Sequence, residues 1–157
     1  MFGPTQLSDA EIDQYSITHY VASGLNAAGW TTVSVDFVRD GWPDYDDLGV
    51  PGVYIDLTDS NVAGIELGSH GKSRIVSFYV YGANDAQRNR LADSVENTVR
   101  DVIPFYDFVD GNETSPDIAG YFLTDSVRWE KIPSVSTTPD KEKWRAVVTA
   151  TLRRQVA

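Results

Sequence analysis

Residues 74–81 read RIVSFYVY, the segment of this chain that most strongly predicts a β-strand. Its side chains alternate between two faces, with Val76, Phe78 and Val80 on one and Ile75, Ser77, Tyr79 and Tyr81 on the other. β-Branched and aromatic residues fit a pleated, half-buried surface. A helix pattern follows at once, since Asn84 and Gln87 match a helix N-cap and its reciprocal partner. The chain therefore has to build a sheet around this strand and pack helices against it.

Two segments carry the apolar spacing of an amphipathic helix. The first is predicted from about Asp9 to Ala28, with a capping box over residues 8–11 and a stop at Gly29. The second is predicted to begin after Asn84 and to be ended by Pro104. Its apolar stripe consists of Leu91, Val95, Val99 and Val102.

Alternating apolar residues predict further strands. They span Thr31–Val38, Gly52–Asp59, the weaker Val62–Leu67, Tyr121–Ile132 and Lys143–Val156. Residues 105–109 fit either a short strand or a packed turn. One face of the last strand is predicted to hold Trp144, Ala146, Val148, Ala150 and Leu152. This order predicts an α+β fold with a mostly antiparallel sheet, two main helices packed on one face and a terminal β-hairpin.

A chain of 157 residues has the length of one domain, so residues 1–157 are predicted to form a single unit. Loops near residues 39–50 and 133–142 are rich in turn formers and are predicted to be mobile.

The sequence has no cysteine, which excludes disulfides and thiolate metal sites and fits a reducing compartment. Its first residues lack the basic and apolar regions of a signal peptide, and no apolar run reaches about 18 residues. We therefore expect a protein made in the cytoplasm, with no membrane segment.

The net charge is −10, and the excess of acids lies in the first half of the chain. Residues 1–71 hold Arg39 against eleven acids, whereas residues 72–157 hold twelve basic and twelve acidic residues. Such a surface repels phosphates and disfavours sequence-independent nucleic-acid binding. The imbalance serves either solubility alone or an acidic face that meets a basic partner or orients identical chains.

Residues 68–73 read GSHGKS and end like a phosphate-binding loop. That motif needs a glycine where Glu66 stands, and it needs a helix after it, where a strand is predicted. A surface turn explains the segment better than nucleotide binding does.

Three acids lie close together in one loop: Asp44, Asp46 and Asp47. Counted from Asp44 as the first position of a calcium loop, the twelfth position is Ile55 instead of the bidentate glutamate. His19 and His70 match no metal-binding spacing. A solvated turn or a subunit contact is the preferred interpretation, with a loosely bound cation as the alternative, and no cofactor is predicted.

Asp56 and Glu66 could face each other across a hairpin, like the paired carboxylates of a glycosidase. Such pairs arise by chance in a chain with 23 acids. The sequence also contains no nucleophile elbow and no cysteine nucleophile. We therefore expect a protein that assembles with other chains rather than an enzyme.

Two aromatic residues of the acidic loop, Trp42 and Tyr45, are hard to bury within one domain. Exposed Trp and Tyr side chains are frequent interface anchors. The alternative is a loop that folds back on its own sheet.

Pro51-Gly-Val-Tyr-Ile55 fits a P-x-V-x-I strand, and residues 74–82 are a basic residue followed by alternating apolar ones. In the next helix, Ala86–Val95 approximates A-x-x-L-A-D-x-V, most closely at residues 90–95, RLADSV. In this order and spacing, over about residues 9–155, the chain resembles the tail terminator (tail completion) proteins of long-tailed bacteriophages.

The resemblance implies a hexameric ring that caps the tail tube, ends its polymerisation and gives the neck of the virion a docking surface. The implied partners are other copies of the chain, the tail tube protein and a neck or head-closure protein. DNA is expected to pass through the channel without specific binding, beside an acidic wall that repels it. The family has no catalytic residues to transfer to this chain.

Two alternatives stay open. The long loops at residues 39–50 and 133–142 would also suit a neck or head-closure adaptor of the same virion. More remotely, a small hydrolase would use an acidic site built from Asp44, Asp46, Asp47 and Glu66.

The predicted contact residues belong to an acidic aromatic loop, a hairpin turn and the terminal strand. They are Trp42, Asp44, Tyr45, Asp46 and Asp47 in the loop, His70 and Lys72 in the turn, and Arg145, Arg153 and Arg154 in the strand.

Overall fold

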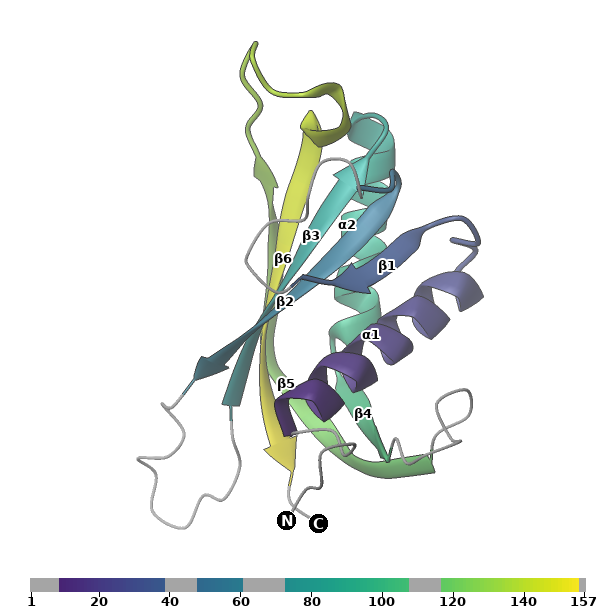
Figure 1. Ribbon diagram of the computed structural model, residues 1–157, viewed down its shortest axis with the longest axis vertical. Coiled ribbons are helices and arrows are strands. Elements are labelled where there is room, and N and C mark those ends of the chain that lie inside the picture. The colour runs from purple at the N-terminus through teal and green to yellow at the C-terminus, as the bar shows by residue number, and fades with distance from the viewer. Residues whose placement is uncertain (1–8, 39–47, 61–72, 108–116, 156–157) are drawn as a thin grey trace.

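The computed structural model describes residues 9–38, 48–60, 73–107 and 117–155 (Figure 1). Along the chain the elements are α1 (Asp9–Ala27), β1 (Ser34–Phe37), β2 (Gly52–Ser60), β3 (Ser73–Gly82), α2 (Asp85–Val99), β4 (Val102–Asp107), β5 (Asp117–Ile132), the short 3₁₀ helix η3 (Asp140–Glu142) and β6 (Trp144–Gln155). Within the described residues, six strands form one sheet in the order β1-β2-β3-β6-β5-β4. β1 and β2 pair in parallel, and the other neighbours pair antiparallel. The predicted α+β fold with a mostly antiparallel sheet is confirmed.

The predicted terminal β-hairpin is also confirmed, as the pair β5–β6. The register runs from Ile132 opposite Arg145 to Tyr121 opposite Gln155, with a bulge near Thr124. β6 lies between β3 and β5, so the last strand of the chain occupies the middle of the sheet. Its alternation places Ala146, Val148, Ala150 and Leu152 in the core, as the sequence predicts.

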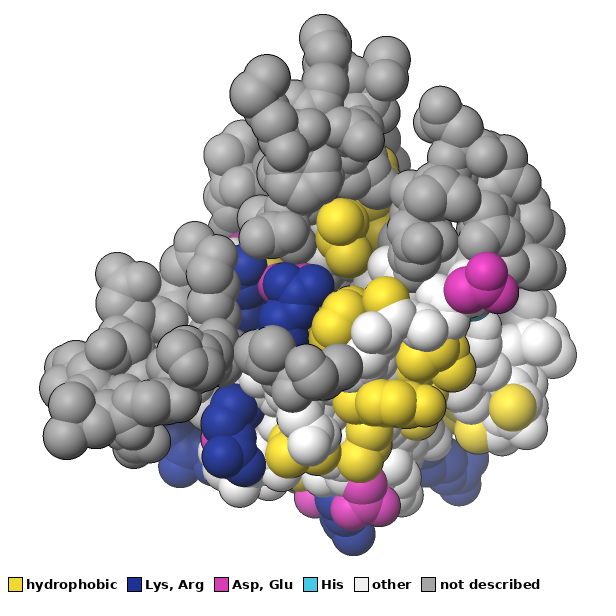
Figure 2. Space-filling model, turned by 90° about the horizontal axis from the view of Figure 1, so that it is seen from below, with side chains coloured by type: hydrophobic (Ala, Val, Ile, Leu, Met, Phe, Trp, Pro, Cys, Tyr) yellow, Lys and Arg dark blue, Asp and Glu magenta, His cyan; other side chains and the backbone are white. Residues whose placement is uncertain are grey.

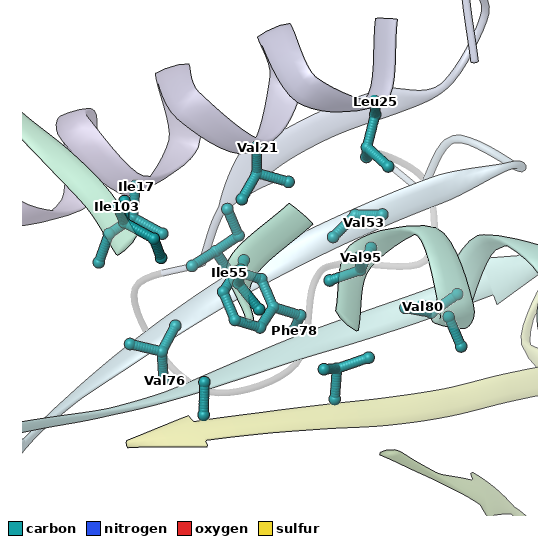
Figure 3. Packing of buried hydrophobic residues seen from close by; sticks show 14 of the residues in the cluster. Ile17, Val21, Leu25, Val53, Ile55, Val76, Phe78, Val80, Val95 and Ile103 are labelled. Atoms are coloured by element: carbon teal, nitrogen blue, oxygen red, sulfur yellow. The ribbon is translucent and has the colours of Figure 1, made fainter. Parts of the chain in front are cut away.

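Both helices pack on one face of the sheet, as predicted. Figure 3 shows Ile17, Val21 and Leu25 of α1 pointing toward sheet residues that include Val53, Ile55 and Phe78. From α2, Leu91, Ala92, Val95 and Val99 enter the same core cluster. Full burial of a Val, Leu, Ile or Phe side chain contributes about 1.5–3 kcal/mol. This core cluster therefore stabilises the sheet from the face that the helices cover.

α1 reaches the strands at both edges of the sheet. At one edge, the ring of Tyr15 meets Phe37 of β1 edge-on, with 5.6 Å between centroids. At the other edge, the backbone N–H of Tyr106 in β4 donates to Ser16 Oγ over 2.9 Å. His19 also packs edge-on against Tyr106, at 5.0 Å between ring centroids. The sheet is therefore curved around α1, as Figure 1 shows.

The end of α1 agrees with the predicted stop signal. Gly29 has φ +100°, a conformation that favours glycine, and it ends α1 as predicted. Its N–H donates to the Asn26 carbonyl over 3.1 Å, and the Trp30 N–H donates to the Leu25 carbonyl over 2.9 Å. This is a Schellman motif. Trp30 Nε1–H then donates to Ser94 Oγ of α2 over 2.9 Å, which ties the two helices together.

At the start of α2, the Asn84 side chain accepts from the Gln87 N–H over 2.8 Å, so the predicted N-cap is confirmed. The Gln87 Oε1 atom accepts from the N–H of Ala83 over 2.7 Å. The Gln87 side chain therefore accepts from Ala83, the residue before the N-cap, instead of from the N-cap residue Asn84.

The segment after α2 differs from the prediction. The helix ends at Val99, and Val102 opens β4 instead of continuing the apolar stripe. Pro104 lies inside this edge strand, a position in a sheet where proline is tolerated. Of the two interpretations of residues 105–109, the strand is correct as far as Asp107. Ser8 and the predicted strand Val62–Leu67 lie outside the described residues.

A buried ion pair joins α1 to β3. Arg74 Nε lies 3.0 Å from Asp13 Oδ2, and the two side chains are 5% and 1% exposed. Arg154 of β6 adds a longer contact, with Nη2 at 3.8 Å from Asp13 Oδ1. Its guanidinium lies over the Phe105 ring, 4.2 Å from the centroid. One carboxylate thus connects α1 to two central strands.

We predict that Asp13→Ala lowers the free energy of unfolding by about 3–5 kcal/mol, because it leaves the Arg74 guanidinium buried without this carboxylate. The measurement is urea denaturation followed by circular dichroism. The matched control is Asp125→Ala, whose exposed contact with Arg153 spans 3.3 Å. Loss of this control pair is expected to cost less than about 1 kcal/mol. Equal losses in the two variants would show that the buried pair does not fix α1.

Candidate interaction surface

Within the described ranges, the residues cover only part of the face of the sheet opposite the helices. In its upper part, Val38 and Leu48 pack over Tyr54 and Tyr81 and are 8% and 4% exposed. Tyr54 also accepts a hydrogen bond from the Gly49 N–H over 2.6 Å. Farther down this face Ile75 is 38% exposed. An antiparallel sheet tolerates one solvated face, but exposed apolar side chains on it mark a candidate contact surface.

A cluster of apolar side chains with one arginine lies on this face where β4, β5 and β6 pair. We call it the corner patch. It consists of Val102, Tyr121, Leu123 and Arg153. Leu123 lies directly between Val102 and Arg153 in the ladders, and Tyr121 is two residues away on the same side of β5. Val102 and Tyr121 are 38% and 45% exposed. Tyrosine and arginine are enriched among the residues that dominate binding at interfaces.

Figure 2 shows the molecule from its lower end, where β5 begins. Hydrophobic side chains gather there beside side chains of lysine or arginine. The exposed large hydrophobic residues of early β5 are Ile118, at 52%, and Tyr121. The lower end therefore combines apolar and basic groups. Protein interfaces have a similar composition, with an apolar core and a polar rim.

The predicted contact residues fall into two groups. Trp42, Asp44, Tyr45, Asp46, Asp47, His70 and Lys72 lie outside the described residues. Arg145 and Arg153 lie on the helix-free face but are eight positions apart on β6, about 26 Å in an extended strand. Arg154 points to the opposite face, toward Asp13 and Phe105. The structure therefore does not bring the three arginines together.

Three groups on the helix-free face, Asp56, Tyr79 and Tyr81, have raised pKa values. Burial raises the pKa of the Asp56 carboxyl above its usual value. Burial also raises the pKa of Tyr79, the charge of Asp56 raises it further, and a hydrogen bond with Ser77 opposes the shift. For Tyr81 burial is again the largest cause, followed by the charge of Glu142, while Arg145 acts in the opposite direction. These tyrosines stay neutral at pH 7.

The raised pKa of Asp56 has a consequence for stability. At pH values below the ordinary pKa of 3.8, the Asp56 carboxyl is protonated in both the folded and the unfolded state and does not lower the free energy of unfolding. As the pH rises through the raised folded-state pKa, the folded protein must hold a poorly solvated charge and loses stability. We predict that Asp56→Asn raises the free energy of unfolding at pH 7, and that this gain disappears below about pH 3.8.

Urea denaturation at a series of pH values between 3 and 7 tests this prediction. The control is Asp101→Asn, a change at an exposed carboxyl. A gain for Asp56→Asn that is independent of pH would contradict the assigned cause.

A second candidate surface is the turn between β5 and β6, residues 133–142, which we call the arm. Figure 1 shows it projecting at the upper end of the molecule, beyond the neighbouring strands. At its tip the Val135 N–H donates to Thr138 Oγ1, and the Thr138 N–H donates to the Val135 carbonyl, both over 2.9 Å. This turn presents Val135 at 68% exposure, the highest value among the exposed large hydrophobic residues described. The mobility predicted for this segment stays a prediction.

Sequence reasoning missed the arm as a contact surface, because its Ser, Thr and Pro content is typical of a linker. The signal was the single apolar residue, Val135, in an otherwise polar turn.

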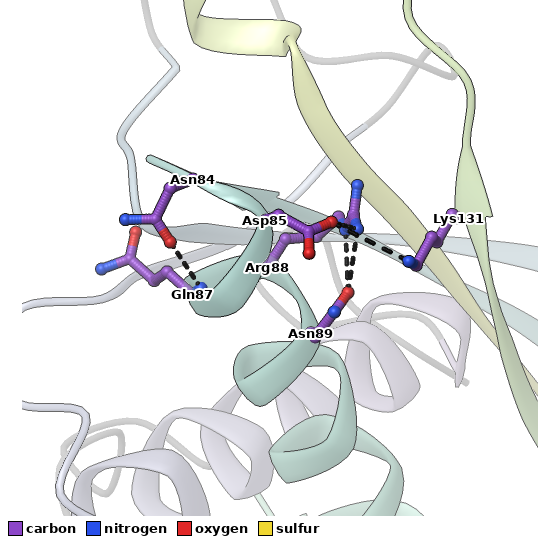
Figure 4. Close-up of polar contacts among 6 residues, drawn as sticks. All are labelled: Asn84, Asp85, Gln87, Arg88, Asn89 and Lys131. Atoms are coloured by element: carbon purple, nitrogen blue, oxygen red, sulfur yellow. Dashed lines mark hydrogen bonds and ion pairs between the residues drawn. The ribbon is translucent and has the colours of Figure 1, made fainter.

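The base of the arm is fastened to the start of α2 (Figure 4). Arg88 is buried, contacts Asp85, and donates from Nη2 to Asn89 Oδ1 over 2.9 Å. Lys131 Nζ, at the end of β5, lies 3.8 Å from Asp85 Oδ1. Trp144, at the start of β6, has Arg88 5.7 Å and Lys143 5.6 Å from its ring centroid. Both strands that enter the arm are thereby held against the helix.

The structure adds little support for a phosphate-binding, hydrolytic or metal-binding site. β3 begins at Ser73, the last residue of the GSHGKS segment, so a strand follows this segment, as predicted. The acids of the remote hydrolase alternative, Asp44, Asp46, Asp47 and Glu66, lie outside the described residues. Among the residues that are described, no three His, Cys, Asp or Glu side chains gather where a metal ion could be held.

Neither helix in the described part of the chain combines the length and the apolar character needed to cross a membrane. Comparison with known proteins adds no relative: no protein-family model matches the chain, and no curated protein matches its sequence.

Proposed function

We propose that this chain is a structural virion protein that forms a hexameric ring on the tail tube of a long-tailed bacteriophage. The ring stops tube polymerisation and offers the surface for head–tail joining. The proposal rests on the resemblance to tail terminators in the order and spacing of elements. The structural observation that best supports an assembly role is the corner patch, where Val102 and Tyr121 are exposed beside Arg153.

Self-association also agrees with the distribution of charge. The β5–β6 hairpin, residues 117–155, holds seven basic and five acidic residues, a net charge of +2. The rest of the chain holds six basic and eighteen acidic residues, a net charge of −12. If the hairpin of one copy meets the rest of another copy, opposite charges come together. Such complementarity fixes the orientation of the copies and speeds their association.

The tail tube protein and a neck or head-closure protein are the proposed partners on the two sides of the ring. The net charge of −10 supports passage of DNA through the channel without specific binding, because the wall repels phosphates. The proposed location is the tail or neck of the virion, after synthesis in the host cytoplasm.

We propose no enzymatic activity. Asp56, the described carboxyl with a raised pKa, faces the open side of the sheet, in line with Ser77, Thr149 and Arg128. A general acid works in a site that closes around a substrate, whereas this row lies on an open surface.

Light scattering coupled to size exclusion tests the proposed assembly. We predict a species of about 104 kDa, six times the chain mass of 17.4 kDa, that appears as a ring in electron micrographs. A ring that joins heads but leaves tail tubes uncapped would favour the neck or head-closure adaptor. A particle of 17.4 kDa at every concentration would contradict both readings.

A further inference from the structure

β1 is an edge strand of the sheet, with β2 on one side only. The N–H groups of Ser34 and Val38 donate toward the β2 side, over 3.0 and 2.8 Å. Since N–H groups alternate in direction along a strand, those of Val35 and Phe37 point away from β2. The described residues supply no acceptor for the outward N–H of Val35. The edge of a sheet is a template on which another extended chain can pair.

Solvent reaches β1 from this outer side. Val35 and Phe37 pack their side chains against the core, yet both remain only half-buried. Their neighbours in the next strand, Val53 and Ile55, are 0% and 1% exposed. The outward N–H of Phe37 donates to Oδ1 of the exposed side chain of Asp36 over 2.8 Å. A carbonyl of an incoming strand can replace this local acceptor.

The opposite edge of the sheet, β4, is closed to a further strand. The Thr124 N–H donates to the Asp101 carbonyl over 3.0 Å. Alternate residues counted from Asp101 therefore bond toward β5, and the backbone of Pro104 and of Tyr106 points outward. Pro104 has no N–H, and the N–H of Tyr106 donates to Ser16 Oγ. Such features prevent the pairing of edge strands.

β5 continues beyond its pairing with β4, so residues 125–132 form a further edge. This stretch carries the acids Asp125 and Glu130 and the bases Arg128 and Lys131, which balance in charge. It therefore has no net charge with which to attract or repel an incoming strand.

The surroundings of β1 have one sign of charge. The described residues 9–38 and 48–60, which form α1, β1 and β2, contain acids but no lysine or arginine. Asp36 is exposed on β1, and Glu11 is exposed one turn before Tyr15, which packs on Phe37. Pairing of β1 with β1 of a second copy would bring these acids together and is disfavoured. The acids of this part are Asp9, Glu11, Asp13, Asp36, Asp56 and Asp59.

We propose that the edge of β1 binds an extended, basic segment of another protein, which pairs with β1 and extends the sheet. Its backbone bonds to Val35 and Phe37, and one of its lysines or arginines meets Asp36. Main-chain hydrogen bonds then give affinity, while the charge of Asp36 selects a basic partner and rejects an acidic one. This inference goes beyond the proposed ring and does not depend on it.

Amide hydrogen exchange followed by NMR tests the proposal. The probe is an acetylated peptide of about eight alternating lysine and valine residues, long enough to form a strand. At a peptide concentration of about ten times its Kd, we expect exchange at Val35 and Phe37 to slow by about tenfold. Exchange at Val102 of β4 should not change. The same peptide with glutamate in place of lysine should not bind.

A matched pair of variants locates the binding site. Asp36→Lys reverses the charge on β1 and is expected to weaken binding of the lysine peptide by about fivefold. Asp101→Lys makes the same change at an exposed carboxyl beside β4 and should alter binding by less than about twofold. Thermal unfolding verifies that both variants fold. If Asp36→Lys is unstable, Asp36→Asn removes the charge and keeps an acceptor for Phe37, with an expected loss of about twofold.

Three results would overturn the proposal. The first is unchanged exchange at Val35 at peptide concentrations up to about 1 mM. The second is an equal loss of binding in Asp36→Lys and Asp101→Lys, which would mean that only the net charge attracts the peptide. The third is slow exchange at Val35 without peptide that becomes slower as the protein concentration rises, which would assign the edge to a second copy. The ring is tested separately by its mass, so the two failures are distinguishable.

Discussion

The packing of both helices on one face of the sheet is the constraint on which the rest of the structure depends. α1 touches both edge strands, at Phe37 of β1 and at Tyr106 of β4, so it holds the sheet in a curve. The buried pair of Asp13 and Arg74 fixes that helix over the central strands. The opposite face, as far as it is described, carries only a smaller buried cluster around Tyr54 and Tyr81.

This arrangement determines which surfaces remain for assembly. Val38 and Leu48 cover the upper part of the helix-free face, while Tyr121 and Val102 stay exposed at the corner patch. At the other end of the hairpin, the contacts of Arg88 with Asp85 and Trp144 anchor the arm without covering Val135. The candidate surfaces thus belong to the β5–β6 hairpin and to the edge strand β4 beside it.

Much of the fold could be predicted because local rules and tertiary packing agree. The alternation of β3 and β6, the N-cap at Asn84 and the stop at Gly29 are examples. The prediction that Pro104 ends the second helix was wrong. Proline breaks helices but is tolerated at the edge of a sheet, and only the topology shows that Pro104 lies in an edge strand. Arg153 and Arg154 differ by one residue and therefore face opposite sides of the sheet. These two predicted contact residues therefore cannot serve the same surface of the sheet, and the loop residues around Trp42 lie outside the described part of the chain.

The proposed function requires that this chain assembles on a tail tube and ends its growth. The most direct measurement is electron microscopy of tubes polymerised from the tail tube protein of the same virion, with and without this chain. We predict tubes that stop growing when the chain is added and that carry a ring at one end. Tubes that keep growing, with bare ends at every ratio of the two proteins, would contradict it.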